Sequence, residues 1–494
     1  MTQHHSPRHF QLFALNRQSL RLAHLTFISL LLSSCLTTTN SDSIREVTVL
    51  YTNDEHGWME GMEEGQSAAN LYALWQEREG FTADGPFLVL SGGDNWTGPA
   101  ISTWTEGESM VEVMNAMDYD ASAVGNHEFD FGLAAFAERA AEATYPYLSS
   151  NTRWRQNNAV PDNIGILPYT IKTVNDISFG IIGLTTLDTP TTTNPLNVAE
   201  LDFIDYEQAL RETAPAVRNN DVDLLLVIAH VCIDELEPLI RATQDLGIAM
   251  MGAGHCNELE ARRVRDTLLL GGGFHFTAYA KVSFTYDTAN DRLLRSRFAT
   301  NESAFDEEAP AIASLVSRWS EQTEGILSEP VAWLASPVAR RSEELEQAVV
   351  NSWLLADSTA DVAITNAGGI RIDLPAGEIN VGTVVALMPF DNTIIAVNVS
   401  GAVLREALEN GTRPVVGGVQ RRGDGWVLSR SGQPLSDSDS YRVLVNSFMY
   451  AGGDGYTMLP EADPDGFDTG INYRQPFQDW LQSQGSSASN PFNF

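Results

Sequence analysis

The sequence predicts an α/β protein, on two observations about its apolar residues. Over residues 43–304, short unbroken apolar runs, typical of strands buried on both faces, alternate with stretches of helical periodicity. This alternation favours a sheet covered by helices on both sides. The length of 494 residues and the hydrophobic fraction of 43% allow two or three domains, each with its own core.

Each expected element of the first part corresponds to one such stretch. The expected strands are residues 47–51, 87–90, 121–124, 224–229 and 248–251, and the expected helices are residues 68–79, 110–117 and 133–143. Residues 305–329 begin acidic and then predict a linker helix. Pro310 suits the first turn of this helix, because the N–H that proline lacks has no partner there.

A second unit with α+β character follows over residues 330–481. It combines a predicted helix at 343–355 with a predicted strand at 362–365 and several glycine-rich turns. The tail, residues 482–494, is rich in Ser, Asn and Gln, and we expect it to be flexible.

The first 34 residues predict a signal peptide. Basic residues precede an apolar stretch at 22–32 that is too short to span a membrane as a stable helix. The string LSSC at 32–35 resembles the bacterial lipobox, which implies cleavage before Cys35 and a lipid anchor on it. The alternative is an ordinary secretory signal. We expect a periplasmic or cell-surface protein, and Leu36, which offers no acidic retention signal, favours the outer membrane.

The negative charge of the chain argues against two classes of binding partner. There are 65 acidic against 30 basic residues, which gives a formal net charge of −35. Nucleic acid and anionic membrane surfaces repel such a charge, so neither is expected as the main partner. The three cysteines are too few for a disulfide scaffold, and the sequence gives no indication of oligomeric state.

Side chains that bind metals follow five of the apolar runs. They are Asp54 with His56, Asp94, Asn126, His230, and His255 with Asn257. Ligands bind at the carboxyl ends of strands in open α/β sheets, so we expect these groups to converge on one crevice. Imidazole, carboxylate and amide oxygen suit Zn²⁺, Mn²⁺ or Co²⁺. Because the set exceeds the needs of one ion, we expect two ions that share Asp94 and activate water for displacement at phosphorus.

Taken singly, each string has a simpler interpretation. The Asp-x-His string can be a turn or a cap, Gly-Asn-His-Glu can be a tight turn, and His230 can be a core histidine bonded to backbone. Their order, each after a predicted strand, favours the metal site. His275 lies outside this pattern and is a weaker candidate for contact with substrate. The chain lacks the His-Glu-x-x-His string of zinc proteases.

The order of these strings resembles that of the 5′-nucleotidase family of calcineurin-like metallophosphoesterases. Three strings of the second unit extend the resemblance: NAGGIR at 366–371, MPF at 388–390 and GGDG at 452–455. The resemblance implies a four-layer metallophosphoesterase β-sandwich flanked by helices at 43–304. It also implies that residues 330–481 form an α+β substrate-binding domain after the linker helix.

The resemblance also assigns roles by position. One ion would bind Asp54, His56, Asp94 and Asn257, and the other would bind Asp94, Asn126, His230 and His255. His127 would face the phosphate and assist the leaving oxygen, with Asp130 orienting its ring. In the second domain, the implied substrate contacts are Asn366, Gly369 and Arg371 near the phosphate, Phe448 against the nucleobase and Asp454 at the ribose.

Several positions depart from the family pattern. Asn257 stands where many relatives have His or Gln, and its amide oxygen is a weaker ligand than imidazole. Asp391 replaces a glycine that is usual after Pro-Phe. The second aromatic of the base clamp is not located, since Trp426 is a candidate only by proximity, and Arg413 is an unplaced candidate for phosphate.

Two cysteines lie close to proposed ligands of one ion. Cys232 follows His230 by two residues, and Cys256 directly follows His255. Strand ends that share an ion are neighbours, and the expected compartment is oxidising, so we predict a disulfide or a pair within bridging distance. The alternative is two unrelated buried thiols.

Together these features predict an extracytoplasmic dimetal phosphoesterase, in which a metal-bound hydroxide attacks the phosphorus of a nucleotide. Nucleoside 5′-monophosphates are the first candidates, with UDP-sugars and 2′,3′-cyclic nucleotides as further ones. Two alternatives stay open: a related hydrolase of the sulfate thiohydrolase type, and a lipoprotein that binds nucleotides without cleaving them.

Overall fold

The computed structural model of the protein describes residues 43–494, which form one compact unit. The predicted signal peptide and the lipid site at Cys35 lie outside these residues. The first half of the unit contains two large sheets. The strand order of the first is β15 (Arg292–Glu302), β14 (Ala278–Asp287), β1, β2, β3, β4 (Tyr147–Leu148) and β6 (Ile166–Leu167). The strand order of the second is β12 (Leu259–Val264), β13 (Thr267–Gly272), β11, β10, β8 and β7 (Tyr169–Val174).

The central strands of both sheets are parallel. In the seven-stranded sheet, β1 (Ile44–Thr52) lies beside β2 (Phe87–Ser91), which lies beside β3 (Ala121–Ala123). In the six-stranded sheet, β10 (Leu224–His230) lies between β8 (Ile177–Thr185) and β11 (Ile248–Ala253). The five strands predicted from apolar runs are therefore confirmed. Parallel neighbours bring their carboxyl ends to one edge of each sheet, and this edge carries the polar strings.

One apolar core lies between the two sheets. Tyr51 and Leu88 of the first sheet and Ile228 of the second are fully buried in it. At roughly 25 cal/mol per Å² of apolar surface removed from water, this interior supplies much of the stability of the domain. It also explains why the strands appear in the sequence as unbroken apolar runs.

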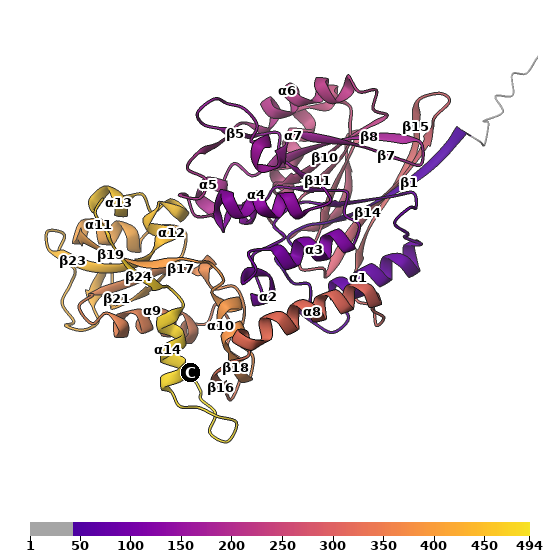
Figure 1. Cartoon of the computed structure of the whole chain (residues 1–494). Coiled ribbons are helices and arrows are strands. Elements are labelled where there is room, and N and C mark those ends of the chain that lie inside the picture. Colours follow the sequence, from indigo (N-terminus) through magenta and orange to yellow (C-terminus); the bar gives the residue numbers. More distant parts are fainter. Residues whose placement is uncertain (1–42) are drawn as a thin grey trace, which may run out of the picture. The chain divides into compact units, whose positions relative to one another are not determined.

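Helices cover the outer faces of both sheets. Buried residues of α1 (Ala68–Leu74), α3 (Glu108–Ala116) and α8 (Pro310–Leu327) pack with Leu50 and Val89 of the seven-stranded sheet. Helices α6 (Tyr206–Arg218) and α7 (Ile233–Ala242) pack on the six-stranded sheet. Figure 1 shows α3 and α8 beside β1 and β14 (Ala278–Asp287), and α6 and α7 beside β8 and β10. These are the four layers that the family resemblance implies.

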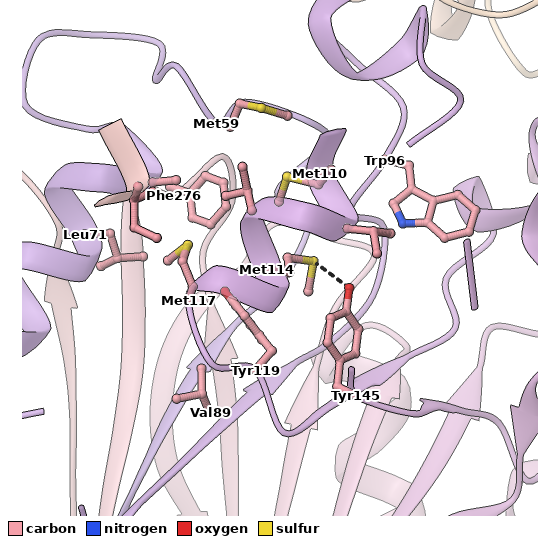
Figure 2. Close-up of a cluster of buried hydrophobic side chains, with 14 of the residues drawn as sticks. Met59, Leu71, Val89, Trp96, Met110, Met114, Met117, Tyr119, Tyr145 and Phe276 are labelled. Atoms are coloured by element: carbon pink, nitrogen blue, oxygen red, sulfur yellow. Dashed lines mark hydrogen bonds between the residues drawn. The ribbon is translucent and has the colours of Figure 1, made fainter. Parts of the chain in front are cut away.

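The packing beneath α3 is rich in methionine. Figure 2 shows Met110, Met114 and Met117 among buried aromatic rings, and the hydroxyl of Tyr145 lies 3.3 Å from the sulfur of Met114. Methionine is flexible and polarisable, so it fills irregular space against rings. The predicted helix 68–79 is confirmed with one difference: its last turn, Trp75–Glu79, is a π-helix that ends at the left-handed Gly80.

The second half of the unit is α+β. Its five-stranded sheet has the order β20 (Pro414–Gly417), β17 (Val362–Asn366), β23 (Ser440–Asn446), β19 (Thr393–Ser400) and β24 (Phe467–Asn472). The sheet is mostly antiparallel, and β17 and β23 are its parallel pair. Helix α9 (Glu343–Ala356) begins at Ser342, whose hydroxyl accepts the N–H of Leu345. Helix α9 and α14 (Gln475–Ser483) pack on one face of this sheet.

The C-terminal tail differs from our expectation of a flexible segment. The Phe492 N–H donates to the Trp333 carbonyl at 2.8 Å, and the Phe492 carbonyl accepts the Ala335 N–H at 2.9 Å. The rings of Phe492 and Phe494 each lie 5.6 Å from the Trp480 ring. Two aromatic residues at the end of a polar tail are enough to pack it onto β16 (Pro330–Leu334).

None of the helices within residues 43–494 is long and apolar enough to cross a membrane.

Candidate active site

The loops at the carboxyl ends of the central strands bring the predicted metal ligands together. Ligand atoms of Asp54, His56 and Asp94 all lie within 4.8 Å of one another, and so do those of Asp94, His230 and His255. Asp94 belongs to both groups, as a bridging ligand would. Asn126 extends the second group, since its Oδ1 lies 3.1 Å from His230 Nε2.

Backbone carbonyls set the orientation of two imidazoles in this cluster. Nδ1 of His56 lies 2.9 Å from the Thr97 carbonyl, and Nδ1 of His230 lies 2.9 Å from the Gly92 carbonyl. A carbonyl accepts, so each Nδ1 carries a proton and each Nε2 faces the carboxylates. Nε2 of His230 lies 3.0 Å from Asp94 Oδ2, and Nε2 of His56 lies 3.9 Å from the same atom. Metal-binding histidines are held by such bonds in proteins.

Several of the proposed ligands have a strained backbone conformation. Asp54, His56, Asp94, His255 and Asn257 all have φ between 45° and 74°, in the left-handed region that non-glycine residues rarely adopt. Each such residue costs of the order of 1 kcal/mol, and strain of this kind gathers at functional sites. The fold therefore accepts a cost to direct these side chains inward.

The electrostatics of the cluster fit divalent cations. Oδ1 of Asp54 is buried and has no hydrogen-bond partner. Burial, together with the Asp94 carboxylate, raises the pKa of Asp54 to about 7. Burial and the neighbouring His230 lower the pKa of His255 to about 4. Buried carboxylates, beside the imidazoles of His56 and His255 whose pKa values burial lowers, are a donor set suited to Zn²⁺, Mn²⁺ or Co²⁺.

Two residues that the sequence analysis missed hold the ligand loops. The Glu128 carboxylate accepts the backbone N–H groups of Asp94 (2.9 Å), Asn95 (2.7 Å) and Gly125 (2.7 Å). The Asn53 amide donates to Asp54 Oδ2 at 2.6 Å. Glu128 ends the Gly-Asn-His-Glu string, so its place in that string was an available signal.

His127 and Asp130 form a buried pair beside the cluster. Nδ1 of His127 lies 2.7 Å from Asp130 Oδ2, and the Thr193 hydroxyl donates to the other oxygen of Asp130 at 2.8 Å. Burial opposes a charged ring, but the carboxylates of Asp130 and Asp94 outweigh it and raise the pKa of His127. The fold thus favours an imidazolium whose Nε2 remains available to an anion.

A pocket of about 290 Å³ joins the metal cluster to the C-terminal half. Its lining from the first half includes His56, Asp94, Asn126, His127, Asp130, His255 and Asn257, and that from the second half includes Asn366, Gly368, Arg371, Phe390, Phe448 and Asp454. Four of the five substrate residues predicted in the second domain therefore lie in the pocket wall. The fifth, Gly369, is not in the wall, and its carbonyl accepts the hydroxyl of Tyr473 at 3.3 Å.

The aromatic residues of the pocket correct the sequence analysis. The second ring that lines it with Phe448 is Phe390, from the Met-Pro-Phe string. Trp426, considered for this role, does not line the pocket and is buried in the hydrophobic cluster that also contains Phe448. Arg413, considered for phosphate, pairs with Glu346 at 3.0 Å. The signal for Phe390 was its membership of a string already recognised.

Phe390 also joins the two halves of the site. Its ring stacks on the His127 ring with 5.5 Å between centroids, and the Arg371 guanidinium lies 5.8 Å from its centroid. No carboxylate among the described residues 43–494 lies within ion-pair distance of Arg371. A guanidinium without a partner in the pocket wall suits an anionic ligand.

His275, the weaker candidate, lies next to the cluster and not in the pocket wall. Its ring is 5.7 Å from that of His56 and 5.2 Å from that of Trp58. Burial, and then the charge of Arg371, lower its pKa to about 3.

The predicted link between the two cysteines is confirmed. Cys232 and Cys256 form a disulfide with 5.3 Å between their Cα atoms. Cys232 precedes the first residue of α7, and Cys256 lies in the loop after β11.

The two-sheet sandwich with its polar loops, followed by an α+β second half, is a fold that comparisons with known proteins also find. Residues 331–461 match the protein family described as the 5′-nucleotidase C-terminal domain. A 5′-nucleotidase of Vibrio cholerae is 26% identical, over 92% of this chain and 93% of that protein. The trifunctional nucleotide phosphoesterase YfkN of Bacillus subtilis is 24% identical over 91% of this chain. The match spans 34% of the length of YfkN.

Solved structures share the fold. A 5′-nucleotidase precursor from Thermus thermophilus has a TM-score of 0.77 at 22% identity, and the match covers 90% of this chain and 97% of that one. The sulfate thiohydrolase SoxB of the same genus has a TM-score of 0.69 at 17% identity, over 89% and 94% of the two chains. The chain is therefore similar to 5′-nucleotidases over most of its length, and its residues 331–461 match the C-terminal domain of that family.

Proposed function

We propose that the protein is an extracytoplasmic 5′-nucleotidase that hydrolyses the phosphate ester of nucleotides with two divalent ions. The observation that carries this proposal is the shared pocket, in which the cluster around Asp94 and His127 faces Arg371, Phe390 and Phe448. One wall suits a phosphate and the other suits an aromatic base. The extracytoplasmic location is supported by the predicted leader at 1–34 and by a disulfide, which persists in oxidising compartments.

In this proposal the cluster holds two ions of Zn²⁺, Mn²⁺ or Co²⁺. The first would bind Asp54, His56, Asp94 and Asn257, and the second would bind Asp94, Asn126, His230 and His255. When bound, two divalent ions supply positive charge that activates water and neutralises the phosphate. Support comes from the shared Asp94 and from the unpartnered Oδ1 of Asp54.

His127 would act on the phosphate directly. Asp130 holds Nδ1 of the ring at 2.7 Å, so the proton on Nε2 can be donated to a phosphate oxygen or to the leaving oxygen. A fixed donor costs no reorganisation when negative charge develops, and such donors are worth about 10²- to 10⁴-fold in rate. Phe390 packs against one face of the ring and helps to exclude water from it.

The second domain would bind the nucleoside. Phe390 and Phe448 offer aromatic faces to a base, and Arg371 offers a guanidinium fork to the phosphate. Burial raises the pKa of Asp454, although its hydrogen bond with Asn366 works against that shift. A partly buried carboxyl group paired in this way suits the hydroxyl groups of a ribose.

The test is a substrate panel with metal-stripped protein reloaded separately with Mn²⁺, Zn²⁺, Co²⁺ or Mg²⁺. The panel contains nucleoside 5′-monophosphates, a UDP-sugar, a 2′,3′-cyclic nucleotide, p-nitrophenyl phosphate and an S-sulfonated cysteine. We expect the highest kcat/KM on a nucleoside 5′-monophosphate. Equal rates on p-nitrophenyl phosphate would contradict nucleoside recognition, and cleavage of the S-sulfonate alone would favour a thiohydrolase. Nucleotide binding without phosphate release would favour the binding lipoprotein.

A further inference from the structure

We propose that the Cys232–Cys256 disulfide positions ligands of the metal centre. This inference rests on the proposed function. The disulfide joins the loop after β10, next to His230, to the loop after β11, which carries His255 and Asn257. We infer that it holds these last two ligands in place and thereby raises the affinity for both ions.

The seven proposed ligands are not equally well held by packing. Asp54, His56, Asp94, Asn126 and His230 are all buried, each with 5% exposure or less. His255 is only partly buried, and Cys256 and Asn257 are exposed. The hydrophobic core therefore fixes five ligands, and it leaves the last two on a loop at the surface.

This surface loop also has the least favourable backbone. His255 and Asn257, on either side of Cys256, have φ values of 74° and 58°. Left-handed residues persist only where the surroundings over-determine them. An exposed loop without a cross-link relaxes toward ordinary backbone angles, and both side chains then turn away from the cluster.

Few hydrogen bonds hold the loop against its neighbour. The Gly254 N–H donates to the Val231 carbonyl at 3.2 Å, and the Glu258 carboxylate accepts the Ile233 N–H at 2.9 Å. The His255 N–H donates to Asp54 Oδ2 at 3.0 Å. The disulfide adds a covalent link between the two loops. Its Cys256 lies between His255 and Asn257, the two ligands that packing does not fix.

The cross-link also bears on the amide ligand. The amide oxygen of Asn257 is a weaker ligand than an imidazole, so its contribution to metal binding depends on the side chain being held in place before the ion binds. His255 and Asn257 belong to different ions in the proposed assignment. Loss of the disulfide is therefore expected to weaken both sites.

The experiment measures metal affinity directly, without substrate. Full-length protein is stripped of metal, and Zn²⁺ and Mn²⁺ binding are measured by calorimetry or by competition with a fluorescent chelator. The variants are C232S/C256S and C232A/C256A. Partners that orient ligands are worth about 10- to 100-fold in metal affinity, and we expect a loss of that size.

Reduction of the native protein gives a second route that needs no substitution. A phosphine reductant converts the disulfide and one water to two thiols and a phosphine oxide, and unlike a dithiol it does not compete strongly for the metal. We expect the same loss of affinity, with two thiols per chain by labelling and an unchanged circular dichroism spectrum. Reoxidation is expected to restore the affinity.

The double variants provide the matched control, because the phosphine should leave their metal affinity unchanged. A disulfide that only stabilises the fold would lower the Tm of the metal-free protein but leave affinity at 25 °C as it was. If the folded, reduced protein keeps its metal affinity, the positioning role is overturned. It is also overturned if the native protein binds no divalent ion. Normal, redox-sensitive metal binding without hydrolysis would instead overturn the proposed function alone.

Discussion

The two walls of the pocket are built in different ways. On the metal side, the residues that matter sit in short strings at the ends of buried parallel strands, such as Asp54 after β1 and Asp94 after β2. On the substrate side, Arg371, Phe390 and Phe448 come from separate turns of a mostly antiparallel domain. Chemistry is thus placed on the rigid part of the fold, and recognition on loops that can change without disturbing it.

This difference predicts separable effects of substitution. Changes on the metal side should abolish turnover on every ester, whereas changes to the aromatic residues of the substrate side should act through KM and only on nucleotides. Phe390 is the exception, because it lines the pocket and also stacks on His127 at 5.5 Å.

The largest effect is expected for Asp94→Asn. The substitution keeps the shape of the side chain but removes the charge shared by both ligand groups. We expect kcat to fall by more than about 10³-fold on all esters, since both ions are weakened together. Metal content by mass spectrometry should fall in parallel. A variant with full metal content and wild-type turnover would contradict the bridging role.

His127→Gln should come next, with the metals retained. Loss of a positioned proton donor costs about 10²- to 10⁴-fold in kcat. The matched control is Asp130→Asn, which leaves the imidazole but removes the carboxylate 2.7 Å from it, and its effect should be smaller. Steady-state kinetics together with metal analysis checks both, and a His127→Gln variant with unaltered kcat would refute the assignment.

Phe448→Leu should have a moderate effect that is confined to nucleotides. Stacking on one aromatic ring is worth about 1–3 kcal/mol, so KM for a nucleoside monophosphate should rise by about 10-fold. Turnover of p-nitrophenyl phosphate should stay at the wild-type level. Phe390→Leu should raise the same KM but also lower kcat, because its ring contacts His127. Equal effects of Phe448→Leu on both substrates would break the division between the walls.

The smallest effect is expected on the pH dependence of stability. Although burial opposes it, Asp94 raises the pKa of His230 to about 9, whereas an unfolded histidine titrates near pH 6.5. The native metal-free protein therefore binds more protons than the unfolded chain between these values, and its stability should fall as pH rises from 7 to 9. Metal-loaded protein should lack this slope. Thermal unfolding of both forms at the two pH values checks it, and a His230→Asn variant serves as control.

The metal side was largely predictable from the sequence. A buried parallel strand appears as an unbroken apolar run, and the polar string directly after it lies at the sheet edge where ligands bind. The structure accordingly brings Asp54, His56, Asp94, His230 and His255 together. Glu128 was missed although it stands in a recognised string, because its three partners are backbone N–H groups that only the folded loops bring to its carboxylate.

The substrate side was predicted less well. Phe448 and Trp426 belong to one buried hydrophobic cluster, and only packing decides that Phe448 also lines the pocket whereas Trp426 does not. The contacts of the C-terminal tail were not predicted for a similar reason. Its polar composition gives no indication that Phe492 and Phe494 contact Trp480.

By itself, the sequence determined the fold class, the order of the strands' polar ends and the chemical kind of the ligands, because periodicity and local strings encode them. The tertiary structure alone decided which aromatic rings face the pocket, that Phe390 reaches His127, and which of the proposed ligands are the most exposed. Those features depend on contacts between residues far apart in the chain, and such contacts form only when the sheets and loops pack.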